Sequence, residues 1–369
     1  MKRAVSVLLV AVLSLLTLGL VMMASIEGHP SKFGPERTKI TNSLVRNQML
    51  EAGIGLVLMW AVSCIDYRRW RPLAGPLLSI VFVLLVLVLI PGIGLARLGA
   101  RRELSFVPFL YFRPSDLAGL ALVLFMVWWY SSENPRALNL FWVPVAVMYG
   151  LGELVFVEPD FSMALLVLLT GWVMMILGKA RYDHIAISIL IPVTGLMWAI
   201  ANNPYSRARL VCFFTPEYNT GPAYLPTFVL ALKSGGWSGV GLGNGHWTDC
   251  FLPETFTGLV TAAIGEELGL VALLIMSGMF AAMIVSGAYI AAKAPDRFGT
   301  LLGTGIVALL AIQVLLNLVS VTWLLPIKAV LLPLVSHGGL SLCVTLTGVG
   351  VLLNIASEAK QESMACAGS

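Results

Sequence analysis

The stretch Leu268–Ala292 reads LGLVALLIMSGMFAAMIVSGAYIAA and contains no charged side chain. A helix of about 20 apolar residues crosses the hydrocarbon core of a bilayer, and a helix satisfies its own backbone hydrogen bonds there. Further apolar runs of this kind, stronger or weaker, are Ala4–Ile26, Ala52–Ile65, Pro72–Ala96, Leu117–Ser132, Ala137–Gly152, Phe161–Gly178, Ile185–Ala201, Phe298–Ile327 and Gly338–Ser357. The sequence therefore predicts an all-α, polytopic integral membrane protein, with about ten transmembrane helices in a single domain.

The composition excludes a soluble protein. Hydrophobic residues make up 58% of the 369 residues and charged residues 11%, whereas soluble domains carry roughly 25% charged residues. The first run follows Lys2 and Arg3, as in a signal peptide, but the apolar part of a signal peptide has only about 7–15 residues. We therefore expect a retained first span. The net charge of +4 reflects membrane topology rather than a nucleic-acid partner, and the partner that the composition indicates is the lipid bilayer.

Basic residues predict the orientation of the chain. With the N-terminus inside, the cytoplasmic segments are Asp66–Arg71, Glu133–Arg136, Lys179–His184, Lys293–Arg297 and the C-terminal tail. These short segments are mostly basic, which agrees with the excess of lysine and arginine in cytoplasmic loops. The sequence thus predicts that both termini are cytoplasmic.

Some outer segments break this charge rule. Their basic residues are Arg97, Arg101, Arg102 and Arg113 before the fourth span, and Arg207, Arg209 and Lys233 after the seventh. One interpretation is that flanking charges are tolerated once other loops have fixed the topology. The other is that the outer face binds an anion, because an arginine holds two phosphate oxygens at once. A phosphate-bearing substrate in the outer leaflet would explain the pattern.

The segment Asn202–Gly258 is predicted to be a large extracytoplasmic loop within the single domain. It contains several prolines, the glycine-rich stretch Gly235–Gly245 and aromatic residues that argue against disorder. The glycines lack the preceding strand and the following acid of a nucleotide-binding loop, so we expect turns there. Cys212 and Cys250 share this loop and either form a disulfide or remain free thiols. The cysteines do not have the spacing of a metal site, and no cofactor is expected.

Several segments, in order along the chain, resemble the motifs of one family. They are CIDYRRWR at Cys64–Arg71, PGIGLARLGARR at Pro91–Arg102, RPSDLAGL at Arg113–Leu120, EPDF at Glu158–Phe161, YSRARLVCFFTP at Tyr205–Pro216, KSGGWSGVGLG at Lys233–Gly243, FLPETFTGLVTAAIGEELGL at Phe251–Leu270, LLPIKAVLLPLVSHGG at Leu324–Gly339 and LLNIAS at Leu352–Ser357. This pattern is similar to that of the FtsW, RodA and SpoVE (SEDS) family of peptidoglycan glycosyltransferases, and within it to the FtsW branch.

The resemblance implies a bacterial cytoplasmic (inner) membrane enzyme that polymerises lipid II at the outer face during cell division. It also implies a class B penicillin-binding protein as transpeptidase partner, together with other division proteins. Lipid II has a pyrophosphate leaving group, which suits basic residues, and an acceptor hydroxyl, which requires a base within hydrogen-bond reach. The candidate substrate-binding residues are Arg101, Arg102, Arg207, Arg209, Lys233 and Lys328.

The aspartate held to be catalytic in the family is replaced in this chain. The segment LPETFTG resembles the family motif that ends in this aspartate, and it places Gly258 at that position. Because glycine takes no proton, a neighbouring carboxylate acts instead, or the activity has been lost, or the aspartate is not required. Glu254 is the first candidate, since residues four apart share one face of a helix, and Asp249 is the second. Other family positions also differ: a tryptophan is Glu103, a glutamine is Arg113, a lysine is Gly119 and a tyrosine is His337.

Three further acids lie at the ends of spans. Asp160 opens the span at Phe161 and is either functional, as intramembrane acids often are, or a helix cap. For Asp116, at the start of the fourth span, the helix-cap interpretation is preferred. Glu266 belongs to the motif GEELGL, and we expect it to make a structural pairing at the outer membrane boundary.

Three functions therefore stay open at this point. The first is a peptidoglycan glycosyltransferase that polymerises lipid II. The second is a catalytically impaired division protein that binds lipid II and recruits a class B penicillin-binding protein. The third is a lipid II flippase, against which the lack of an inverted repeat in the sequence argues.

Overall fold

The computed structural model describes the chain except for residues 28–34, 91, 93, 98–99, 108–109, 133–141, 159, 203–224, 247–257, 323, 325–329 and 368–369. Within the described residues, long helices occupy every one of the predicted spans. They are α1 (Lys2–Glu27), α2 (Pro35–Ser63), α3 (Ala74–Leu89), α4 (Pro114–Tyr130), α6 (Trp142–Val157), α7 (Phe161–Leu177), α8 (Tyr182–Asn202), α14 (Gly269–Ala292), α15 (Arg297–Val321) and α16 (Gly339–Ala367). The prediction of an all-α, polytopic membrane protein is confirmed.

The helices differ in how fully they meet the requirements of a membrane span. By length and apolar composition, α1, α14, α15 and α16 are each able to cross a bilayer, while α3, α4, α6, α7 and the first part of α8 are shorter apolar helices. The first half of α2 contains charged residues such as Glu36 and Lys39, which lowers its hydropathy. The apolar residues of α2 that face outward, such as Val57 and Trp60, follow in its second half.

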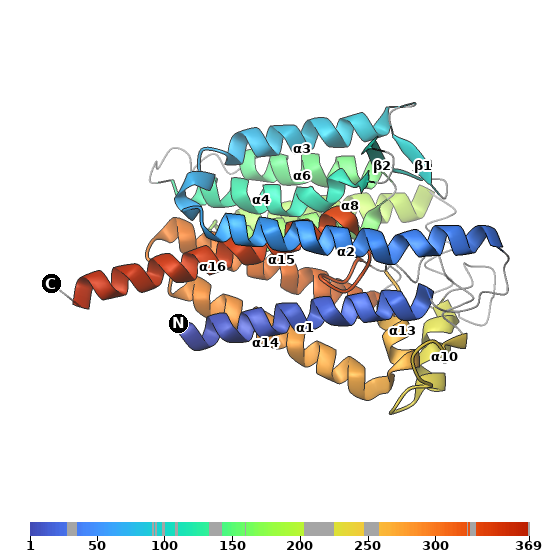
Figure 1. The fold of residues 1–369 in the computed structure, drawn as a ribbon. Coiled ribbons are helices and arrows are strands. Elements are labelled where there is room, and N and C mark those ends of the chain that lie inside the picture. The colour runs from blue at the N-terminus through green and yellow to red at the C-terminus, as the bar shows by residue number, and fades with distance from the viewer. Residues whose placement is uncertain are drawn as a thin grey trace.

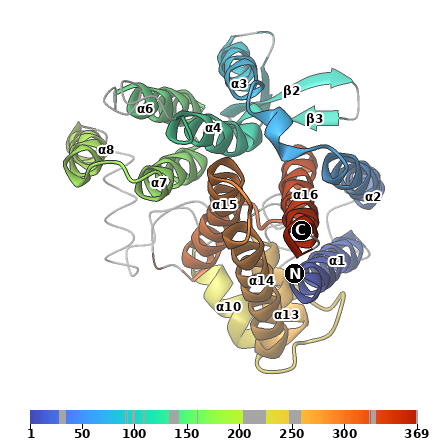
Figure 2. The ribbon, with the colours of Figure 1, turned by 90° about the vertical axis from the view of Figure 1, so that its left-hand side faces the viewer.

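The long helices form one bundle, with both termini at the same end (Figure 1). Seen from that end, α15 lies between α7, α4 and α14, with α16 beside it (Figure 2). The side chains of α15 are accordingly among the most buried of the long helices. We call the end of the bundle opposite the termini the far end.

Two short helices, α10 (Leu225–Gly235) and α13 (Val260–Glu267), lie at the far end (Figure 1). A small antiparallel sheet also lies there, which the apolar pattern did not predict. Its strands are β1 (Leu95–Arg97), β2 (Ala100–Val107) and β3 (Leu110–Phe112) in the order β1-β2-β3. Because the sheet leads directly into α4 at Arg113, it places Glu103 of β2 beside the start of that helix.

The end of the bundle that holds the termini is closed by a cluster around Tyr67, in the 3-10 helix η1 (Tyr67–Trp70) between α2 and α3. The Tyr67 hydroxyl donates to Asp296 at 2.5 Å, and its backbone N–H donates to the Asn354 side chain at 2.9 Å. Arg68 lies 3.2 Å from Glu362 and 3.7 Å from Asp296. These contacts fix the α2–α3 connection to α15 and α16.

Candidate active site

The segment Gly235–His246, which we call the glycine loop, folds back on α13. Gly239 and Gly241 have φ angles of +79° and +97°, a conformation that glycine adopts without the strain a Cβ atom causes. The backbone N–H groups of Val240 and Gly241 donate to the carbonyl oxygens of Glu266 and Glu267 at 3.0 and 2.9 Å. A Cβ atom on Gly239 would lie 2.1 Å from the backbone carbonyl oxygen of Glu267. Glycine at this position therefore allows the loop to contact α13 directly.

The carboxylates of Glu266 and Glu267 bind this loop from within the protein. Both residues are buried. Glu266 accepts a hydrogen bond from the backbone of His246 at 2.7 Å, and Glu267 accepts one from the backbone of Gly243 at 3.3 Å. The hydroxyl of Ser25, on α1, donates to Glu267 at 2.5 Å. These backbone N–H groups are thus occupied by protein carboxylates, and Glu266 holds the loop in place.

Gly258, which the motif resemblance places at the position of the family aspartate, is a buried turn residue followed by Leu259, the N-cap of α13. Its carbonyl oxygen accepts a hydrogen bond from the side-chain amide of Asn317, on α15, at 3.2 Å. The same amide group donates to the carbonyl of Val330, and its oxygen accepts from the hydroxyl of Thr261 at 2.7 Å. One buried side chain therefore joins the Gly258 turn, α13 and the segment before α16.

A cluster of charged residues lies where the sheet meets α4. The guanidinium of Arg113 contacts the Glu103 carboxylate through two nitrogens, at 3.1 and 3.2 Å, and it also interacts electrostatically with Asp116 and Asp160. Asp160 is the N-cap of α7, accepting from the backbone of Met163 at 3.4 Å. Three acidic side chains thus lie around one guanidinium.

Asp116 does not cap α4, contrary to the preferred interpretation of the sequence. The N-cap of α4 is Arg113, whose backbone is extended and whose side chain makes no capping hydrogen bond. Asp116 lies in the first turn and turns instead towards a cavity between helices, where it interacts with the backbone of Ser341. The helix-cap interpretation is wrong because α4 begins at Pro114, so that Asp116 is its third residue and the N-cap position belongs to Arg113.

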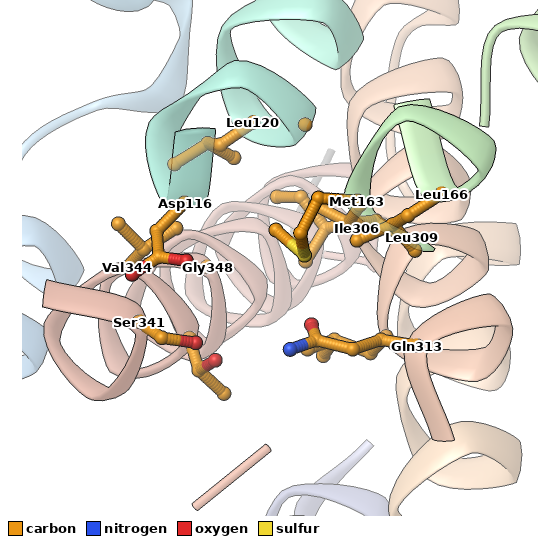
Figure 3. A pocket seen from close by; sticks show the side chains of 13 residues that line it. Asp116, Leu120, Met163, Leu166, Ile306, Leu309, Gln313, Ser341, Val344 and Gly348 are labelled. Carbon is orange, nitrogen blue, oxygen red and sulfur yellow. The ribbon is translucent and has the colours of Figure 1, made fainter. Parts of the chain in front are cut away.

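The cavity is enclosed by α4, α7, α15 and α16 (Figure 3). Asp116 and Ser341 approach it from one side and Gln313 from another, while Met163 and Leu166 belong to its apolar wall (Figure 3). The cavity leaves a volume of ≈ 20 Å³ in which the centre of a water molecule can lie, and this is enough to hold ordered water. A carboxylate, an amide and a hydroxyl from separate helices are therefore brought together in an otherwise apolar space.

The structure locates part of the predicted substrate-binding set. Lys233 is exposed in the last turn of α10, next to the glycine loop. Arg101 and Arg102 lie on β2, but their side chains fall outside the described residues. Also outside the described residues are the candidate catalytic acids and the remaining candidates: Asp249, Glu254, Arg207, Arg209, Lys328 and both outer cysteines, Cys212 and Cys250.

Sequence reasoning missed the polar face of α15. Gln313, Asn317 and Ser320 lie in an otherwise apolar run at the spacing of one helix face, and all three are buried. Buried polar side chains in a membrane helix usually contact another helix or line a cavity. This spacing was the signal that could have identified Asn317 and Gln313.

A family model described as "cell cycle protein" and named for FtsW, RodA and SpoVE matches residues 6–361. The chain belongs to this family. The resemblance that the sequence motifs indicated is therefore confirmed, and the family match includes all of the site described above.

Family members of several bacteria are similar over most of their length. A "probable peptidoglycan glycosyltransferase FtsW" of Geobacter metallireducens is 35% identical over 322 residues, which are 86% of this chain and 85% of that protein. The stage V sporulation protein E of Bacillus subtilis is 32% identical over 356 residues, covering 94% of this chain and 95% of that protein.

Solved structures share the fold along the whole chain. A chain of a peptidoglycan synthase complex, solved to show how polymerization and crosslinking are coordinated, has a TM-score of 0.76 at 25% identity and covers 96% of this chain and 98% of its own length. The rod shape determining protein RodA of Thermus thermophilus has a TM-score of 0.68 at 24% identity, with 95% of this chain and 96% of that chain covered.

Proposed function

We propose that this chain is a peptidoglycan glycosyltransferase that polymerises lipid II into glycan strands during cell division. The observation that carries the proposal is family membership over residues 6–361, together with relatives named as peptidoglycan glycosyltransferases that align over most of both chains. Transfer occurs at the far end of the bundle, where the Gly258 turn, the glycine loop and the charged cluster are found.

The reaction requires a base for the acceptor hydroxyl and cations for the pyrophosphate. Glycine at position 258 supplies no base, so we assign this role to Glu254, with Asp249 as the second candidate. Arg101, Arg102, Arg207, Arg209, Lys233 and Lys328 are the candidates for binding the phosphates. The guanidinium of Arg113 is already paired with the Glu103 carboxylate at 3.1 Å, so we place the phosphates elsewhere.

The partner and the cellular location follow from the same proposal. A related chain forms part of a peptidoglycan synthase complex, and we propose a class B penicillin-binding protein as the transpeptidase partner here, alongside other division proteins. The helices lie in the bacterial cytoplasmic membrane, with the termini in the cytoplasm and the far end outside, because the segments beside the termini are mostly basic.

Gly258 favours one alternative, a division protein that binds lipid II and recruits the transpeptidase without polymerising it. In that protein the loss of the base would leave the fold and the binding surface in place. The alternative predicts lipid II binding and partner binding with no turnover, and a gain of activity when the carboxylate is restored.

The deciding experiment is a lipid II polymerisation assay on the purified protein with its transpeptidase partner. We expect polymer from the wild type, and a rate about 100-fold lower for Glu254→Gln, since a general base contributes roughly 10²–10⁴-fold. Asp183→Asn, which changes a carboxylate with 73% exposed side-chain area in the first turn of α8, is the matched control and should keep the wild-type rate.

Two results would overturn parts of this proposal. No polymer from the wild type, with polymer from Gly258→Asp, would establish the lipid II-binding alternative. Equal rates of polymerisation for the wild type and Glu254→Gln would show that Glu254 is not the base. Asp249 would then be the candidate base, and Asp249→Asn would test it.

A further inference from the structure

Asn317 connects two segments at the far end that otherwise belong to different parts of the chain. Its side chain is fully buried in α15. Its amide nitrogen donates to the carbonyls of Gly258 and Val330, and its oxygen accepts from Thr261. Both polar atoms of the side chain are therefore used, and each bond leads to a segment outside α15.

The segment Val330–Ser336 depends on such partners. It is neither helix nor strand, and it is buried throughout. Irregular backbone inside a membrane protein must find hydrogen-bond donors within the protein. Asn317 supplies one to Val330 and Gln313 supplies one to Leu331 at 3.0 Å, so these two side chains of α15 fix this segment.

Chain connectivity relates these bonds to the candidate reacting groups. Gly258 follows Glu254 by four residues, and Val330 follows Lys328 by two. The backbone carbonyls that Asn317 binds are thus close in sequence to the proposed base and to a proposed phosphate-binding lysine. Thr261 adds the first turn of α13 to the same unit.

We infer that Asn317 is a positioning residue that fixes the Gly258 turn and the first turn of α13 relative to the segment Val330–Ser336. The inference rests on the proposed function, because it assigns Asn317 to the geometry of glycosyl transfer. Displacing a reacting group by about 1 Å can cost roughly 100-fold in rate. Loss of Asn317 should therefore lower kcat while the helices around it remain folded.

The test compares Asn317→Leu and Thr261→Val with Ser320→Ala in the polymerisation assay. Ser320 is the matched control, since it is buried on the same helix but its hydroxyl bonds to the Asn317 backbone carbonyl within α15. We expect Asn317→Leu to lower kcat about 30-fold with KM changed less than about three-fold. Thr261→Val, which removes the hydroxyl with little change in shape, should lower kcat a few-fold, and Ser320→Ala should match the wild type.

The double variant Asn317→Leu/Thr261→Val should be no slower than Asn317→Leu, because Thr261 has then already lost its partner. Hydrogen–deuterium exchange gives a second readout that does not depend on activity. Asn317→Leu should speed exchange both at the residues that follow Gly258 and in Val330–Ser336, while Ser320→Ala should change neither.

These outcomes separate the inference from the proposed function. A folded Asn317→Leu protein with the wild-type kcat would overturn the inference, as would faster exchange in one segment alone or kcat losses that multiply in the double variant. A wild type that makes no polymer would instead overturn the proposed function, and exchange would still decide whether Asn317 links the two segments.

Discussion

Glu103 and Arg113 lie ten residues apart, on either side of β3, and their side chains form an ion pair at 3.1 Å. The motifs that this sequence resembles carry a tryptophan and a glutamine at these positions, and we infer from the ion pair that the two departures compensate each other. Gly119 is a third departure, and it faces α15, where a Cβ atom would lie 2.7 Å from the side chain of Leu309. A lysine at position 119 would therefore require Leu309 to move.

We predict that Arg113→Gln lowers the free energy of unfolding by about 2 kcal/mol, because it removes the guanidinium that contacts the buried Glu103 carboxylate at 3.1 Å. Thermal unfolding in detergent measures this change. The double variant Glu103→Trp/Arg113→Gln, which introduces the residues of the motifs that this sequence resembles, should recover most of the loss. Equal melting temperatures for Arg113→Gln and the wild type would show that the pair contributes nothing.

At the scale of elements, the glycine loop and α13 form one unit, joined by backbone hydrogen bonds and by the two buried carboxylates. Gly236 and Gly239 both have positive φ angles, of +55° and +79°. They differ in their surroundings, since a Cβ atom on Gly236 would meet nothing within 4 Å. Alanine variants at these two positions therefore measure two effects separately. Gly236→Ala tests the free-energy cost of the backbone conformation alone, and Gly239→Ala adds the cost of the collision with α13.

Gly236→Ala should destabilise the protein by about 1 kcal/mol, the cost of placing an L-residue in the left-handed conformation. Gly239→Ala should cost about 3 kcal/mol, because the added methyl group also collides with the Glu267 carbonyl. Thermal unfolding, with hydrogen exchange of the loop amides, compares the two variants. Similar losses for both would mean that the loop does not pack against α13 as described.

At the scale of the whole molecule, the two ends of the bundle differ in chemistry. The end with the termini holds the Tyr67 cluster and Cys64, whose side chain is exposed. The far end holds α10, α13 and the glycine loop with its exposed Trp237. Tryptophan is typical of the membrane–water interface, which supports the placement of the glycine loop at a membrane surface.

We predict that the two ends lie on opposite sides of the cytoplasmic membrane. In a background with Cys212, Cys250, Cys343 and Cys366 changed to alanine, Cys64 should react with a membrane-impermeant maleimide only after spheroplasts are permeabilised. With Cys64 also changed to alanine, Ser238→Cys, at an exposed position of the glycine loop, should react in intact spheroplasts. The reverse labelling pattern would contradict the predicted orientation.

The sequence alone determined the helices and the family of this protein. The apolar run at Leu268–Ala292 and its counterparts predict spans because burial in lipid depends on the composition of each segment by itself. The motifs were also readable without a structure, since each of them is contiguous in the sequence, and the replacement of the family aspartate by Gly258 stays a prediction from them. The small sheet was not predicted, because β1 and β3 have only three residues each and such short strands show no recognisable alternation of apolar and polar residues.

The tertiary structure decided which side chains act together. Ser25 and Glu267 are separated by 242 positions and Thr261 and Asn317 by 56, yet each pair shares a hydrogen bond. Asp116, which the local sequence favours as a helix cap, turns to a cavity formed with α16. Such choices depend on helices that meet only in the folded bundle. The spacing of Gln313 and Asn317 on one face of α15 is visible in the sequence, but their partners near Gly258 follow only from packing.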